Sequence, residues 1–157
     1  VDCTVHVGAL TGDEMVYIIR TDSSKPYRMR SRVGLAISLH STGMGKATLA
    51  DWDADRVVDY AERTGLPART EATITDITAL AAALQEIRAD GYALDLGENE
   101  VGTVCVSAPI FDHTGRVTHG LSISSLALAH PERSIEELAP AAIAAADEIS
   151  RLLGAAR

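Results

Sequence analysis

The chain has 157 residues, of which 46% are hydrophobic, so it is long enough for one globular domain with an enclosed core. Its 22 acidic and 14 basic side chains leave a formal net charge of -8, which repels nucleic-acid phosphates and argues against direct binding of DNA. The two cysteines are too few for a disulfide scaffold and no apolar run approaches the roughly 20 residues that span a membrane, so a cytoplasmic protein is expected.

The chain opens with a predicted β-hairpin. Residues 3–9 and 14–20 alternate between apolar and polar side chains, and the turn residues TGDE connect them. This start lacks the basic segment of a signal peptide, and the absence of an initiator methionine allows the chain to be a fragment. Residues 27–34 are interpreted as a further strand or an extended loop.

Helical periodicity appears in three segments of the chain centre. A short helix is predicted over 42–50, a second over 53–65, and a third over 76–89 with Gly91 as its C-terminal cap. The apolar stripes of the second and third helices consist of Val57, Val58 and Ala61, and of Leu80, Leu84 and Ile87, respectively.

A last helix is predicted from Ser134, which has capping-box spacing to Glu137. Its apolar stripe consists of Ile135, Leu138, Ala142, Ile149 and Leu153. Pro140 lies inside this pattern, and its missing N–H indicates either a kink or a later start of the helix. The order of the elements, without repeats or linkers, predicts one α+β domain.

Two strands, 102–110 and 117–125, are predicted around the turn DHTG. One face of this pair is apolar, and the other carries small polar side chains. The apolar set is Val104, Val106, Ala108, Ile110, Leu121 and Ile123, and the polar set is Thr103, Cys105, Ser107, Ser122 and Ser124.

The register of these two strands depends on the turn. A four-residue loop pairs Phe111 with Arg116, and it places Cys105 opposite Ser122 and Thr103 opposite Ser124. A glycine-bulge turn pairs Asp112 with Arg116 and exchanges the faces. Hydrophobic matching favours the first register. The small polar face then has two open interpretations: it is exposed to solvent, or it leaves volume and hydrogen bonds for a bound molecule.

The stretch LHSTGMGKATLA, residues 39–50, has some features of a phosphate-binding loop. Counting back from its GK pair puts His40 at the required first glycine and Ala47 at the required hydroxyl, so the motif fails at both ends. Its glycines and helix start still allow backbone N–H groups to face an anion or a carbonyl group. The alternative is that Ser41 or Thr42 caps the helix and the glycines permit close packing on a sheet.

Three segments together resemble the effector-binding domain of the IclR (isocitrate lyase regulator) family of bacterial transcription factors. They are SLHSTGMGKATLA at 38–50, GYALD at 91–95 and VGTVCVSAPIFDHTGRVTHGLSISS at 101–125. The similarity follows the family's order over essentially the whole chain, 1–157. It implies a GAF- and PAS-like fold, in which a curved antiparallel sheet and flanking helices form a ligand cup. The winged helix-turn-helix domain that precedes this domain in the family is absent from the chain.

The resemblance also implies the contacts of an effector. They are the backbone N–H groups of Gly43 and Met44, the Asp95 carboxylate, the Cys105 thiol and the hydroxyls of Ser122 and Ser124; Ile37, Leu39 and Met44 are expected to form an apolar wall. Met44 is bulkier than the alanine of many relatives and is expected to narrow the cup. The expected effector is a small molecule, in the first place a carboxylate, and no cofactor or membrane is expected. Operator DNA is expected to bind only through the missing N-terminal domain of a homodimer or homotetramer.

Other charged side chains near these segments have expected structural roles. Arg28, Arg30 and Arg32 are interpreted as a solvated or subunit-facing segment in preference to an anion clamp. Lys46 is expected to point outward from its helix, away from the site. His40 has no convincing second ligand nearby, so no metal site is predicted.

Two other functions compete with a sensor. Cys105 with Asp95 and a histidine such as His40 would make a thiol-dependent hydrolase, but Cys105 lies in a strand between valines, without the base or helix N-terminus that activates a nucleophilic cysteine. The chain is therefore not expected to be an enzyme. A ligand-free dimerisation module is the second alternative, and it predicts no stabilisation by a small molecule.

Overall fold

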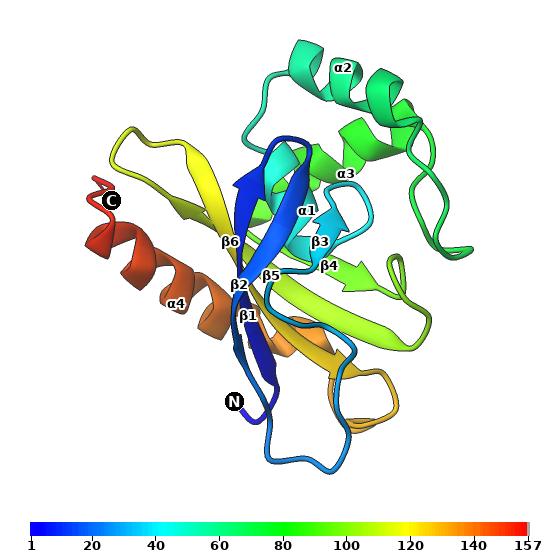
Figure 1. Ribbon diagram of the computed structural model, residues 1–157, viewed down its shortest axis with the longest axis vertical. Coiled ribbons are helices and arrows are strands. Elements are labelled where there is room, and N and C mark those ends of the chain that lie inside the picture. Colours follow the sequence, from blue (N-terminus) through cyan, green and yellow to red (C-terminus); the bar gives the residue numbers. More distant parts are fainter. Residues whose placement is uncertain (157) are drawn as a thin grey trace.

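Six strands form one curled antiparallel sheet in the order β3-β2-β1-β6-β5-β4 (Figure 1). This computed structural model describes residues 1–156. The strands are β1 (Thr4–Thr11), β2 (Glu14–Thr21), β3 (Ala36–Ser38), β4 (Ala93–Leu96), β5 (Thr103–Phe111) and β6 (Val117–Leu126). The sheet with its flanking helices confirms the expected α+β class, and its curl leaves a concave face.

Helices cover both faces of the sheet. They are α1 (Gly43–Leu49), α2 (Ala54–Thr64), α3 (Ile77–Asp90) and α4 (Ala139–Leu152), the last preceded by the 3-10 turn η1 (Ile135–Leu138). Helix α4 packs on one face of β5 and β6, whereas α1 packs on the other face with α3 and α2 beyond it (Figure 1). Within the described residues, none of the helices has the length and apolar character needed to cross a bilayer.

Local signals explain where the helices begin. The first three each follow a side chain that accepts a backbone N–H of the first turn: Thr42 from Gly45, Asp53 from Arg56 and Asp76 from Ala79. Their bounds agree with the predicted ones to within one residue. Two stripe residues were wrong. Val58 is 40% exposed, and the buried face of α2 is formed by Val57 and Tyr60. Leu153 is 42% exposed and lies just beyond the end of α4.

Pro140 marks a later helix start. Ser134 and Glu137 make the predicted capping box, but the turn that follows is the 3-10 turn η1. Helix α4 begins only at Ala139, so Pro140 lies in its first turn, where no backbone N–H partner is needed.

The turn between β5 and β6 is the glycine-bulge alternative. The Asp112 N–H donates to the Arg116 carbonyl at 2.9 Å, and Gly115 has a φ of 79°, which favours glycine. A second irregularity between Ile110 and Phe111 follows directly. One bulge exchanges the two faces of a strand pair and a second restores them.

The strand faces were therefore predicted correctly and the cross-strand partners were wrong. Cys105 lies opposite Ser124 in place of Ser122, and Thr103 lies opposite Leu126 in place of Ser124. The register is displaced by two residues, so the thiol and hydroxyls still share one face.

Two short strands were not predicted, because they have too few residues to show a period. Strand β3 adds to β2 at one edge of the sheet, and β4 adds to β5 at the other. Residues 27–34 contain no strand and belong to an extended loop, 22–35, which we call the strap.

Close contact between α1 and the sheet depends on glycines. Gly8 and Gly120 lie opposite one another on β1 and β6, directly under Met44. A Cβ atom on Gly8 would lie 2.6 Å from the Met44 Sδ, and one on Gly120 would lie 2.7 Å from the Met44 Cβ. A Cβ on Gly43 would lie 2.5 Å from the Ser107 Oγ. Helix capping and close packing, the alternative interpretation of this stretch, are thus both observed.

Candidate functional site

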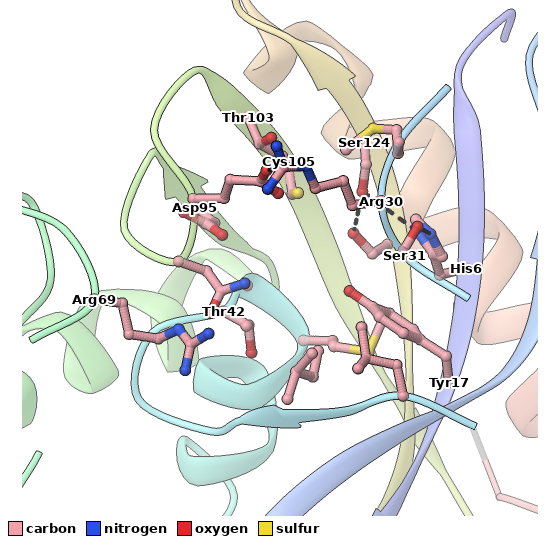
Figure 2. Close-up of a pocket in the computed structure, with 18 of the residues that line it drawn as sticks. His6, Tyr17, Arg30, Ser31, Thr42, Arg69, Asp95, Thr103, Cys105 and Ser124 are labelled. Atoms are coloured by element: carbon pink, nitrogen blue, oxygen red, sulfur yellow. Dashed lines mark hydrogen bonds and ion pairs between the residues drawn. The ribbon is translucent and has the colours of Figure 1, made fainter. Parts of the chain in front are cut away.

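A pocket of about 330 Å³ opens between the concave face of the sheet, the start of α1, the strap and the β4–β5 loop (Figure 2). It is lined by His6, Tyr17, Met29, Arg30, Ser31, Leu35, Ala36, Ile37, Thr42, Gly43, Met44, Arg69, Asp95, Asn99, Glu100, Thr103, Cys105, Ser122 and Ser124. Seven of the eight residues expected to contact an effector are among them. We call this hollow the effector pocket.

Small polar side chains from three strands form the floor of the effector pocket. The Ser122 and Ser124 hydroxyls are 3.0 Å apart, and the Ser124 Oγ is 3.5 Å from the His6 Nδ1. The other ring nitrogen of His6 lies 2.6 Å from the Ser31 Oγ, which brings the strap to the floor (Figure 2). The result is one hydrogen-bonded row from β6 across β1 to the strap.

His6 is neutral in this row. Burial lowers the pKa of its ring to about 4, and the charge of Arg20 acts in the same direction. A neutral imidazole has one donor and one acceptor nitrogen, so His6 can connect two hydroxyl groups. The alternating pattern of residues 3–9 places His6 on the concave face, but the sequence alone did not single it out.

The start of α1 borders the pocket. Thr42 caps the helix by accepting the Gly45 N–H at 3.2 Å, and its own hydroxyl donates to the Ser38 carbonyl at 2.7 Å. The first amides of a helix have no partner within it, so the N–H groups of Gly43 and Met44 remain for another acceptor. Both residues line the pocket, as expected from the sequence.

Asp95 is a buried carboxylate at the pocket edge. It accepts the Glu98 N–H at 2.7 Å, which holds the start of the β4–β5 loop. Burial raises its pKa to about 6, against the opposing effect of that hydrogen bond. Asp95 is therefore an acceptor near neutral pH and a donor in mild acid.

The expectation for Lys46 was wrong in one respect: the side chain does not line the effector pocket, as expected, but it does not point outward from the helix either. Its side chain is buried, and the Nζ donates to both Glu98 carboxylate oxygens, at 2.8 and 2.9 Å, and to the Leu94 carbonyl at 2.7 Å. Seven-residue α1 is buried on all sides, so even a lysine on it must find a partner inside the protein. The pair fixes α1 to the loop that lines the pocket.

Two apolar residues of the expected wall have different places. Ile37 lines the effector pocket from β3. Leu39 is fully buried in the core with Leu49 and Tyr60, and it does not line the pocket. Strand β3 ends at Ser38, where the chain turns towards α1, so Leu39 does not continue the strand face that carries Ile37.

The sequence did not predict the arginines at the pocket. Arg30 from the strap and Arg69 from the α2–α3 loop both line it, and Arg30 lies 3.7 Å from the Glu100 carboxylate (Figure 2). The α2–α3 loop is held in place by Thr70 and Thr73, whose hydroxyls donate to the carbonyls of residues 97 and 98. Arg30 was considered as part of an anion clamp, whereas no pattern in the sequence pointed to Arg69.

Cys105 and His40 lack the features of a catalytic pair. Burial, with the nearby Asp95 charge, raises the pKa of the Cys105 thiol to about 12, so the thiolate needed for attack does not form at neutral pH. His40 contacts the Tyr60 hydroxyl at 3.1 Å and the Pro67 carbonyl at 3.0 Å, outside the pocket. Across residues 1–156, no group of three or more His, Cys, Asp or Glu side chains is placed to hold a metal ion.

Comparison with known sequences points to one group of proteins. The family model for "Bacterial transcriptional regulator IclR C-terminal" matches residues 1–151. The HTH-type transcriptional regulator KdgR of Escherichia coli K12 is 40% identical over 151 residues, which are 96% of this chain and 57% of that protein. The HTH-type transcriptional regulator BhcR of Paracoccus denitrificans is 34% identical over 147 residues, 94% of this chain and 53% of that protein. The chain spans about half the length of these curated relatives.

Solved structures show the same fold. The crystal structure of Thermotoga maritima IclR matches with a TM-score of 0.90 and 38% identity, over 98% of this chain and 62% of that one. The C-terminal domain of Escherichia coli KdgR matches with a TM-score of 0.81 and 38% identity, over 98% of this chain and 88% of that one. The similarity therefore includes every element that borders the effector pocket.

Proposed function

The chain belongs to the IclR family of bacterial transcriptional regulators as a C-terminal domain, and on this premise we propose that its effector pocket senses a small organic acid. The observation that carries the proposal is the convergence of hydrogen-bond donors on one hollow. The Gly43 and Met44 amides, the serine hydroxyls of the floor and two arginines surround the same 330 Å³. This volume is at the small end of the range for ligand pockets and suits a metabolite.

The lining divides into groups with different chemistry. Arg30 and Arg69 at the mouth, and the two amides at the start of α1, are donors for a carboxylate. Ser122 and Ser124 can donate to a second oxygen, and Asp95 can accept from a ligand hydroxyl. Met44 and Ile37 supply the apolar contact. An acid that also carries a hydroxyl or carbonyl group would use all of these groups.

The alternative functions have less support. A thiol-dependent hydrolase needs Cys105 as a thiolate, and burial keeps that thiol protonated. The relatives KdgR and BhcR are both named as transcriptional regulators. A dimerisation module without a ligand leaves the polar floor and the uncapped amides without a role.

Control of transcription requires parts outside this chain. We propose that a helix-turn-helix domain, of the kind named in the relatives, binds operator DNA in the cytoplasm, because the net charge of -8 disfavours DNA contact by this domain itself. We also propose a homodimer or homotetramer. A ligand can then change the affinity of the regulator for DNA only if it binds one arrangement of these domains more tightly than the other.

Thermal denaturation with a library of small organic acids tests the proposal. An effector at about a hundredfold excess over its Kd adds about 2.7 kcal/mol, which corresponds to a rise in Tm of roughly 5 to 10 °C for a domain of this size. The double variant Ser122→Ala and Ser124→Ala is expected to lose that rise while remaining folded. The control is Ser23→Ala with Ser24→Ala, two serines at the start of the strap whose hydroxyls contact Lys25 and Asp2 and do not line the pocket. An unchanged rise in the first double variant would show that the effector binds elsewhere.

A further inference from the structure

A second pocket, of about 190 Å³, lies on the α4 side of the sheet, between the ends of β5 and β6 and the turn η1. Its apolar walls are Val104, Leu126, Ile135 and Leu138. Thr103 and Cys105, the neighbours of Val104 on β5, line the effector pocket. Successive side chains of a strand point to opposite faces, so the two pockets lie back to back across the sheet. We call this hollow the rear pocket.

One end of the rear pocket contains a histidine nitrogen without a partner. The Nε2 of His130 is buried and makes no hydrogen bond to any of residues 1–156. Its other ring nitrogen, Nδ1, lies 3.5 Å from the Glu132 carboxylate and can donate to it, which leaves Nε2 for another partner. Nε2 accepts a hydrogen bond when the ring is neutral and donates one when the ring is an imidazolium. Buried polar groups without partners are rare in native proteins, and a bound molecule is one of the explanations for them.

A cationic side chain lies at the same end. Arg133 lines the rear pocket, and within the described part of the chain no carboxylate lies within salt-bridge distance of it. Its charge reaches the pocket interior: burial raises the pKa of the Cys3 thiol, and Arg133 opposes that effect. The rear pocket therefore combines apolar walls with a positively charged, hydrogen-bonding end.

We propose that the rear pocket is a second ligand site, which binds a small apolar carboxylate with its carboxylate at His130 and Arg133. The guanidinium group supplies charge-assisted donors, and the His130 Nε2 supplies another when the ring binds the carboxylate as an imidazolium. Apolar cavities of about 150 Å³ hold benzene, so 190 Å³ accommodates an aromatic acid of the size of benzoate. The proposal does not rest on the function of the effector pocket.

The two sites must be told apart in any test, because they share strands. The segment 130–138, which leads into α4, contributes lining residues to the rear pocket and none to the effector pocket. Ser125 also lines the rear pocket, and its hydroxyl lies 3.1 Å from the Tyr27 hydroxyl of the strap. Amide resonances of 130–138 therefore report on the rear pocket, whereas those of the strap respond to both.

The test is an NMR titration of the isotope-labelled chain with benzoate. We expect the amides of residues 130–138 to shift and saturate, and benzamide, the neutral analogue, to bind about tenfold more weakly. Arg133→Gln is expected to weaken benzoate binding by about tenfold, whereas Arg151→Gln, an exposed arginine on α4, leaves the Kd unchanged. His130→Phe removes the unpaired nitrogen, so it is expected to abolish benzoate binding and to raise the Tm of the unliganded protein.

Three results would overturn the proposal. Shifts restricted to effector-pocket residues would place benzoate at the first site. If benzoate and benzamide bind with equal Kd values, the rear pocket does not recognise the carboxylate. The same conclusion follows if Arg133→Gln leaves the Kd for benzoate unchanged. Loss of the shifts in a longer chain that carries the preceding domain would show that a protein segment fills the rear pocket.

Discussion

Two buried titratable residues in the effector pocket respond to acid in opposite directions. Burial raises the pKa of Asp95 to about 6, above its unfolded value of 3.8, and lowers the pKa of His6 to about 4, below its unfolded value of 6.5. Asp95 favours folding below pH 3.8, and this contribution is lost as the pH rises through 6. His6 favours folding above pH 6.5, and this contribution is lost as the pH falls through 4. The two effects offset each other between pH 4 and 6.5.

Single substitutions are expected to expose these opposed slopes. In Asp95→Asn, the free energy of unfolding falls on acidification from pH 6.5 to 4.5 relative to the wild type, because His6 acts alone. In His6→Asn, it rises over the same interval. Each change is on the order of 1–2 kcal/mol. Urea denaturation at several pH values measures both, and parallel pH profiles for the two variants would contradict the assignment.

Lys46 and Glu98 form a buried ion pair whose partners depend on one another. The side chains are 6% and 11% exposed, and the Nζ and the carboxylate oxygen lie 2.8 Å apart. Lys46→Met leaves the Glu98 charge buried without its partner, so the free energy of unfolding is expected to fall by about 3 kcal/mol. Adding Glu98→Gln is expected to recover much of that loss. Urea denaturation measures these changes.

An exposed pair on the same protein provides the control for this prediction. Arg63 and Asp13 lie 2.8 Å apart, with side chains 52% and 35% exposed. Arg63→Met is expected to change stability by less than about 1 kcal/mol. Equal effects of Lys46→Met and Arg63→Met would show that burial of the first pair has no energetic consequence.

Among the elements, the strap forms one wall of the effector pocket. Its middle is joined to the sheet by the Tyr27 contact to Ser125 at 3.1 Å and by the Ser31 contact to His6 at 2.6 Å. Its two ends are held separately, by hydrogen bonds from Ser24 to Asp2 and by backbone hydrogen bonds of residues 34 and 35 with residue 17. None of its residues is fully buried, so the middle of the strap depends mainly on the Tyr27 and Ser31 contacts. The strap also brings Arg30 to the mouth of the pocket.

Removal of both contacts is expected to loosen the strap without unfolding the domain. In the double variant Tyr27→Phe and Ser31→Ala, hydrogen exchange of residues 22–35 is expected to accelerate, while the Tm falls by only a few degrees, since each hydrogen bond contributes about 1 kcal/mol. Mass spectrometry of exchanged peptides measures this, with Ser23→Ala as the control. Unchanged exchange in 22–35 would show that other contacts hold the strap.

The whole molecule has two hydrophobic cores, one on each face of a shared sheet. One core includes Leu84 of α3 and surrounds α1, and the other includes Ile123 of β6 and packs against α4. The polar floor of the effector pocket lies on the same face of the sheet as the first core. The sheet lies between the two cores and contributes side chains to each of them. Trp52, the single tryptophan, belongs to the first core.

This arrangement predicts cooperative unfolding of both layers. Leu84→Ala and Ile123→Ala are each expected to lower the free energy of unfolding by about 3 kcal/mol, and each should shift Trp52 fluorescence and far-UV circular dichroism together. The physical reason is that β5 and β6 contribute side chains to both layers. In Ile123→Ala, a circular dichroism transition that precedes the fluorescence transition would show that the α4 layer unfolds by itself.

Local chemistry made much of this molecule predictable from its sequence. The helices begin at Thr42, Asp53 and Asp76 because those side chains accept N–H groups of the adjacent turn, and such signals involve only a few residues. Alternation along β5 and β6 separated the polar face from the apolar one for the same reason. The family was also identifiable from three motifs, and most of the expected contact residues do line one pocket.

Tertiary structure decided what depends on residues far apart in the chain. A second bulge set the partner of Cys105, a buried loop carboxylate turned Lys46 inward, and the end of β3 put Leu39 into the core. Arg30 and Arg69 meet at one pocket only because the strap, which contacts β1 and β6, and the α2–α3 loop, which contacts the β4–β5 loop, border the same hollow. Sequence determines local backbone preference and the face of each strand, whereas the position of a long side chain on a loop is set by whatever packs against that loop.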